Sequence, residues 1–81
     1  MENPLSTPAL LGSELRNWRK RRGLTQAIIA TRLGLMQKSV SAIETHTAQT
    51  SVDRLFQLLA ALDLEVVVRA RSGPASPGAE W

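Results

Sequence analysis

The sequence contains no cysteine and only one histidine, His46. Without cysteine, neither a disulfide framework nor a thiolate metal site can form. A single histidine also excludes any metal site built from several histidines. The seven acidic residues are scattered, and no glycine-rich phosphate-binding loop is present. Because these shortages leave no nucleophile–base pair and no metal cluster, the sequence predicts a protein that is not an enzyme and has no cofactor.

Long hydrophobic runs are missing as well. No stretch approaches the roughly 20 apolar residues that a membrane span requires, so we expect no membrane partner. The first residues, MENPLSTPALL, include no basic residue. We therefore expect no secretory leader and a cytoplasmic location. The 81 residues fit one small domain, whose single core is marginal in size, so a partner subunit would add stability.

Positive charge is in mild excess but unevenly placed. Ten Lys and Arg residues stand against seven Asp and Glu residues, which gives a formal net charge of +3. Half of the basic residues fall in one short segment: Arg16, Arg19, Lys20, Arg21 and Arg22. A local excess of this kind favours a polyanionic partner.

Start and stop signals predict four helices. The first begins at Thr7, whose hydroxyl precedes Pro8, and it ends at Gly23. The second begins at Thr25 and closes at Gly34. The third spans about residues 37–45, and a fourth is capped by the residue at position 50 or 51. In the fourth, the expected apolar stripe has spacings of three and four residues: Val52, Leu55, Phe56, Leu59 and Leu62.

The segment EVVVRAR, residues 65–71, predicts a β-strand because Val66, Val67 and Val68 are consecutive β-branched residues. No other segment has a strand pattern, and a single strand leaves its backbone N–H and C=O groups unpaired. We therefore expect this strand to pair with the same strand of a second copy, in a homodimer. The alternative is that the valines form an extended cover over the core of their own chain.

Two short helices joined by a tight turn, TQAIIATRLG-LMQ-KSVSAIE, match a helix-turn-helix pattern. Inward packing of Val40 and Ile43 against the preceding helix would turn the start of the third helix outward. The side chains presented there are polar: Gln37, Lys38, Ser39 and Ser41. Gln can pair with adenine, Lys with the acceptors of guanine, and Ser with either base or with a phosphate. The alternative is that this cluster is an ordinary solvated helix start.

The stretch GLTQAIIATRLGLMQKSVSAIE resembles the Cro/phage-repressor-type helix-turn-helix family, in which TQ, a small residue four or five positions later, LG and a final Glu recur. The resemblance covers about residues 10–62. It implies an all-α, four- to five-helix, lambda-repressor-like DNA-binding domain, nucleoid-associated in the cell. It also implies that Gln26 clamps a phosphate, with an added backbone contact from Thr25. Ile28 departs from the family pattern, which usually has a polar residue at that position.

The same resemblance assigns roles to two further pairs of residues. Gln37 and Lys38, at the start of the recognition helix, are implied to read base edges. Arg19, late in the first helix, is implied to form a structural pair with Glu44 at the end of the recognition helix. We therefore do not expect Arg19 to be a free DNA-contacting charge.

The order of features after residue 62 resembles the HipB-like antitoxins of type II toxin–antitoxin systems. The residues that carry this likeness are LFQLLAALDLEVVVRARS and the final EW. It implies a homodimeric repressor that binds a palindromic operator, represses its own operon and neutralises a HipA-like serine/threonine kinase toxin. Trp81, a large apolar side chain ending a Pro-, Gly- and Ser-containing tail, is expected to anchor in a partner. That partner is the toxin or a protease that recognises the tail; the alternative is a chance terminal residue.

The sequence thus predicts four parts: a flexible N-terminal arm (1–6), a helix-turn-helix DNA-binding domain (7–63), a dimerisation strand (64–71) and a flexible C-terminal tail (72–81). The predicted function is that of an operator-binding repressor and antitoxin. Two alternatives are a phage- or plasmid-type repressor without a toxin partner, and a helical interaction module that does not bind DNA.

Overall fold

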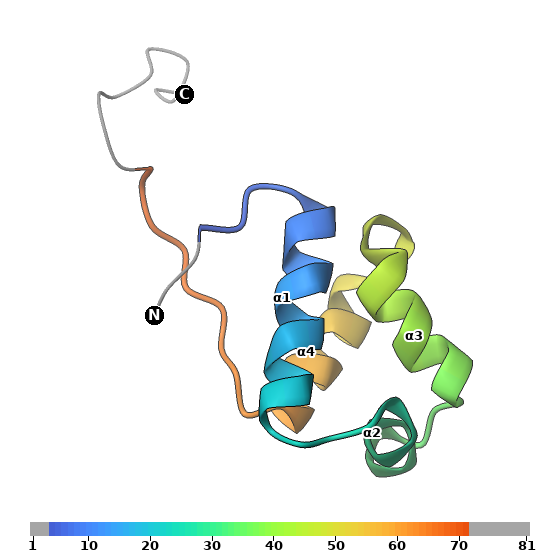
Figure 1. Cartoon of the computed structure of the whole chain (residues 1–81). Helices are drawn as coiled ribbons and strands as arrows, with labels where there is room; N and C mark the ends of the chain where they lie inside the picture. The colour runs from blue at the N-terminus through green and yellow to red at the C-terminus, as the bar shows by residue number, and fades with distance from the viewer. Residues whose placement is uncertain (1–3, 72–81) are drawn as a thin grey trace.

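The computed structural model describes residues 4–71, and this part of the chain is helical. In chain order it contains α1 (Pro8–Arg21), α2 (Gln26–Leu33), α3 (Gln37–Thr45), the short 3-10 helix η1 (Thr47–Gln49) and α4 (Val52–Ala61) (Figure 1). The all-α class predicted for the domain is therefore confirmed over the described residues.

Side-chain hydroxyl groups begin three of the four α-helices of residues 4–71. Thr7 Oγ1, Thr25 Oγ1 and Ser51 Oγ each accept a hydrogen bond from the backbone N–H three residues later, at 3.2, 3.1 and 3.1 Å. Each bond satisfies an N–H group that has no partner inside its helix. The predicted starts of α1 and α2 are confirmed, and Ser51 is the residue that caps α4.

A glycine in the left-handed conformation follows α1 and another ends α2. Gly23 has φ +67° and Gly34 has φ +68°, a region that costs other residues free energy because of their Cβ atom. After Gly34, the N–H of Leu35 donates to the carbonyl of Ala30 at 2.9 Å, which closes the end of α2. The chain then reverses within a short turn, and α3 begins at Gln37.

The core lies between the helices and takes residues from all four α-helices and the residue that follows α4. Its buried members are Leu15, Ile29, Ala30, Val40, Ile43, Leu58, Leu59 and Leu62. α2 packs against both α3 and α4, while α1 packs against α3 and η1. The predicted contact of α3 with α2 is present, because Val40 and Ile43 share the core with Ile29 and Ala30.

The buried face of α4 differs from the predicted stripe. Leu58 is fully buried, whereas Val52 and Phe56 are 67% and 53% exposed. Val52 and Phe56 therefore belong to the predicted apolar stripe but not to the core of the single described chain. Both sets of residues have helical spacing, and the position of α2 and α3 on one side of α4 decides which set is covered.

α1 lies very close to the end of α3 at Gly12. A Cβ atom at this position would overlap the carbonyl oxygen of Glu44 and the hydroxyl oxygen of Thr47. A glycine inside a helix ordinarily weakens it, but here the missing side chain allows α1 to approach the end of α3 closely. This contact holds the C-terminal part of α3 against α1 and leaves the first turn of α3 at the edge of the molecule (Figure 1).

Residues 64–71 have neither helix nor strand in the single described chain. Val66, Val67 and Val68 are exposed, with Val68 at 93%, so these residues do not cover the core of their own chain. The predicted strand needs a second chain to pair with, and it stays a prediction together with the homodimer. Trp81 and the rest of the tail lie outside the described residues.

Among residues 4–71, no helix combines the length and the apolar character that crossing a membrane requires.

Candidate nucleic-acid interface

The first turn of α3, together with the residue before it, projects from the helical body. We call residues 36–39 the α3 tip. Gln37 and Lys38 are exposed there, and Ser39 is half-buried. Val40 and Ile43 of the same helix are buried, so α3 has one face in the core and its start in solvent. Ser41, the last residue of the predicted polar cluster, is half-buried one turn along the helix.

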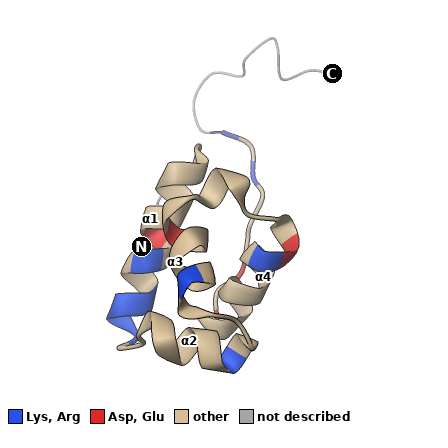
Figure 2. Cartoon of the chain, turned by 90° about the vertical axis from the view of Figure 1, so that its right-hand side faces the viewer, with Lys and Arg blue, Asp and Glu red and all other residues tan. Residues whose placement is uncertain are grey.

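Basic residues from three other helices lie around α3. Figure 2 shows Lys and Arg segments on α1, α2 and α4 around α3, whose single basic residue is Lys38. Arg32 is the basic residue of α2 and Arg54 that of α4. This surface has the polar first residues of a helix at its centre and positive charge around them. It suits a polyanion that also offers hydrogen-bond donors and acceptors to those polar side chains.

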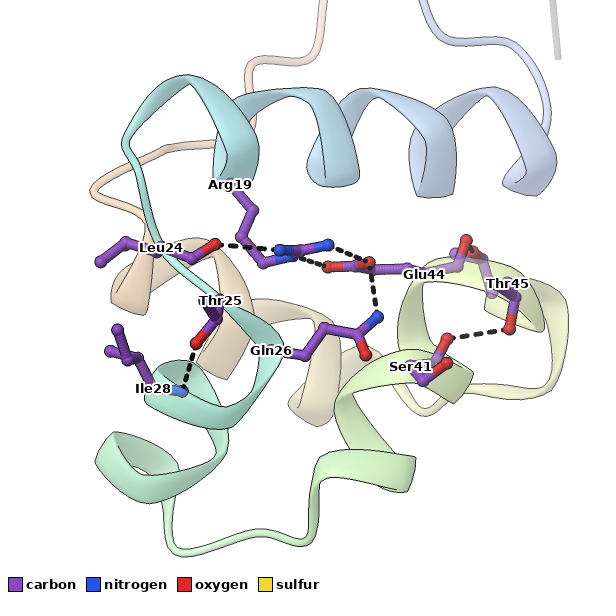
Figure 3. A network of polar contacts seen from close by, with 9 residues as sticks. Arg19, Leu24, Thr25, Gln26, Ile28, Ser41, Glu44 and Thr45 are labelled. Atoms are coloured by element: carbon purple, nitrogen blue, oxygen red, sulfur yellow. Dashed lines mark hydrogen bonds and ion pairs between the residues drawn. The ribbon is translucent and has the colours of Figure 1, made fainter.

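A buried network of polar side chains connects α1, α2 and α3 behind this surface (Figure 3). The Arg19 guanidinium donates to both carboxylate oxygens of Glu44, from Nε to Oε2 at 2.7 Å and from Nη2 to Oε1 at 3.2 Å. Nη1 of Arg19 also donates to the carbonyl of Leu24 at 2.9 Å. The structure therefore contains the Arg19–Glu44 ion pair, with side chains only 9% and 0% exposed.

Gln26 joins the same network at the start of α2. Its Nε2 donates to Oε1 of Glu44 at 3.1 Å (Figure 3). A carboxylate can only accept, so the amide nitrogen must face Glu44. This leaves the amide oxygen and the second N–H of the half-buried Gln26 for another partner. Thr25 is exposed beside it, but its hydroxyl already caps α2.

The basic run of α1 is divided by the fold into residues with different roles. Arg19 is buried in the ion pair. The guanidinium carbons of Arg21 and Arg22 lie 5.1 and 5.2 Å from the ring centroid of Trp18, within cation–π range. Arg16 and Lys20 are exposed. The local charge excess therefore does not act as one uniform patch, because neighbouring positions on a helix point in different directions.

A shallow groove of about 210 Å³ runs beside α3, and the sequence did not reveal it. It is lined by residues of α3, of the connector and of the start of α4: Ser39, Ala42, Ile43, Gln49, Thr50, Ser51 and Arg54. Hydroxyl, amide and guanidinium groups are all able to donate hydrogen bonds to phosphate oxygens. No local pattern predicts this groove, because its lining residues come from α3, the connector and the start of α4, which meet only in the folded chain.

Five of the predicted site residues fall into two groups. Arg19 and Gln26 each contact Glu44. Gln37 and Lys38 begin α3, at the end of the helix opposite Glu44.

Comparison with known proteins gives one matching family. A family model described as a helix-turn-helix domain matches residues 10–71, which is most of the chain. No curated protein sequence matches the chain.

Among solved structures, the chain is similar to HipB. A structure described as a HipB–O1–O2 complex has a TM-score of 0.81 at 23% identity, over 85% of this chain and 100% of that chain. The structures described as a HipA–HipB–O2–O3 complex and as a HipB–O4 20mer complex give the same TM-score and identity, over 85% of this chain and 97% of theirs. At this identity the likeness establishes a shared fold.

Proposed function

The chain belongs to the helix-turn-helix domain family, and we propose that it is a sequence-specific DNA-binding repressor whose recognition helix is α3. The observation that carries this proposal is the α3 tip. Gln37 and Lys38 are exposed at the start of a helix whose apolar residues are buried, and basic residues of other helices surround it. A DNA major groove admits an α-helix and offers donors and acceptors to its side chains.

In this proposal the DNA-contacting residues divide between bases and phosphates, and Arg54 is added to those predicted from the sequence. Gln37 and Lys38 read base edges, since they are the exposed long polar side chains of the tip. Ser39 and Arg54 lie on the groove beside α3 and contact the phosphate backbone, which places the protein on the duplex. Gln26, oriented by Glu44, offers its remaining amide groups to a phosphate, with Thr25 beside it.

We further propose that two copies act together. Two recognition helices about 34 Å apart would enter successive major grooves and read a palindromic operator. The exposed Val66, Val67 and Val68 support this, because an extended segment of exposed β-branched residues is suited to pairing with its own copy. Such a repressor acts at the nucleoid, in the cytoplasm.

The antitoxin role extends the proposal to a protein partner. The likeness to HipB, including a structure that contains HipA, supports a HipA-like kinase toxin as that partner. Trp81 would provide an apolar anchor for the toxin, or for a protease that acts on the tail. Copurification tests this role: a kinase-sized protein encoded by the adjacent reading frame should copurify with the chain. If none does, we infer a repressor without a toxin partner.

The DNA-binding proposal is tested with Gln37→Ala. Affinity is measured by fluorescence anisotropy for a duplex selected by the native protein and for random-sequence DNA. We expect a loss of about 1–3 kcal/mol on the selected duplex and little change on random DNA. Gln57→Ala is the matched control, since Gln57 lies on α4 and bonds to Asp53. Equal losses on both DNAs would rule out a base-reading role for Gln37.

A further inference from the structure

Met36 is an exposed apolar side chain at the α3 tip. It is 62% exposed, whereas Leu35 before it is half-buried and Val40 after it is fully buried. Its backbone is extended, with φ −80° and ψ 150°, and it directly precedes Gln37. Most of this side chain is in solvent, so it contributes little to the core.

Met36 also occupies a position where the chain elsewhere uses a hydroxyl group. It is the N-cap residue of α3, and it makes no side-chain hydrogen bond to the helix. In the other α-helices of residues 4–71 this position is Thr7, Thr25 or Ser51, and each accepts a bond from the helix. A thioether is a weak acceptor, so methionine forgoes a stabilising cap at the helix start that projects from the body.

The chemistry of the major groove suggests what an apolar side chain would contact there. Base edges in this groove are polar, except for the C5 methyl group of thymine. A methionine side chain is unbranched and polarisable, and it adapts its shape to a small apolar group. The basic residues on α1, α2 and α4 around α3 favour a polyanion over an apolar protein surface as the occupant of this region (Figure 2).

We propose that Met36 contacts the C5 methyl group of one thymine in each operator half-site and is a specificity-determining residue. The proposal rests on the DNA-binding function proposed above. It differs from the roles of Gln37 and Lys38 because it requires an apolar contact and no hydrogen bond.

The test uses the duplex selected by the native protein from a random-sequence library. Each thymine is replaced in turn by deoxyuridine, which lacks only the C5 methyl group and keeps its hydrogen-bonding edge. For the native protein we expect one thymine position at which the replacement weakens binding about fourfold per half-site, or about 15-fold when both half-sites carry it. The Met36→Ala variant should bind the thymine duplex more weakly than the native protein does. It should also bind the thymine and deoxyuridine duplexes with equal affinity.

Two further variants separate recognition from folding. Val52→Ala removes an apolar side chain of similar exposure from the start of α4, and it should keep the native discrimination between thymine and deoxyuridine. Met36→Ser should raise the melting temperature, because serine supplies the missing cap, and should lose the discrimination.

The outcomes distinguish this inference from the function on which it rests. A native protein that selects a duplex but tolerates every deoxyuridine overturns the role of Met36 and leaves the repressor in place. The same holds if Met36→Ala still discriminates, or if it loses no affinity for the thymine duplex. A native protein that selects no duplex overturns both.

Discussion

Replacing Glu44 by alanine should remove about a third or more of the stability of this domain. The Glu44 carboxylate is fully buried and accepts three hydrogen bonds, two from Arg19 and one from Gln26. Glu44→Ala leaves the Arg19 guanidinium, only 9% exposed, without its counter-charge. Removing one partner of a buried ion pair costs about 3–5 kcal/mol. A domain of this size has a free energy of unfolding of roughly 3–10 kcal/mol in total.

The double variant Arg19→Met, Glu44→Leu separates the cost of the unpaired charge from the value of the pair. With both charges replaced by apolar groups of similar length, no buried ion is left, and such replacements are often close to neutral. Gln26 and the carbonyl of Leu24 each lose a hydrogen-bond partner, at about 1 kcal/mol apiece. We therefore expect the double variant to cost about 2 kcal/mol, less than Glu44→Ala alone.

Urea unfolding followed by circular dichroism measures these free energies, and the single variants Arg19→Met and Glu44→Leu complete the cycle with the double variant. Glu65→Ala is the control, since Glu65 is exposed and its loss should change stability by no more than about 0.5 kcal/mol. If the double variant costs as much as the two single variants added together, Arg19 and Glu44 do not act as a unit. A loss below about 1 kcal/mol for Glu44→Ala would also refute the reasoning.

Three other changes test the fold and the assembly. Gly12→Ala should destabilise the domain by about 1–3 kcal/mol despite the higher helix propensity of alanine, because its methyl group meets the end of α3 and η1. Thermal melting measures this effect, with Ser13→Ala at an exposed position of the same helix as the control. Deleting residues 65–71 should convert the proposed dimer to monomer in sedimentation velocity, and an unchanged dimer would contradict the shared strand. Trp81→Ala should leave binding to the proposed operator intact and weaken capture of the proposed kinase partner; unaltered capture would mean that the indole is no anchor.

Local chemistry was enough to predict the helix boundaries and the helix-turn-helix motif. The hydroxyl caps at Thr7, Thr25 and Ser51 and the glycines after α1 and α2 act through their own backbone and the next turn. The sequence cannot supply the packing direction of a helix with more than one apolar face. For that reason the predicted stripe of α4 contained the exposed Val52 and Phe56 and missed the buried Leu58.

The sequence by itself determined which segments are helical and which polar residues begin α3, because these depend on interactions over a few residues. Only the tertiary structure decided which residues of those segments contact one another and which are buried. The family resemblance implied the pair of Arg19 with Glu44, 25 positions apart, but the orientation of Gln26 by Glu44 across 18 positions is visible only in the structure. The lack of a side chain at Gly12 is needed only because the end of α3 and the start of η1 pack against it. Met36 is exposed only because the other helices do not cover it. Burial and contact between distant residues arise from packing, and no local pattern contains them.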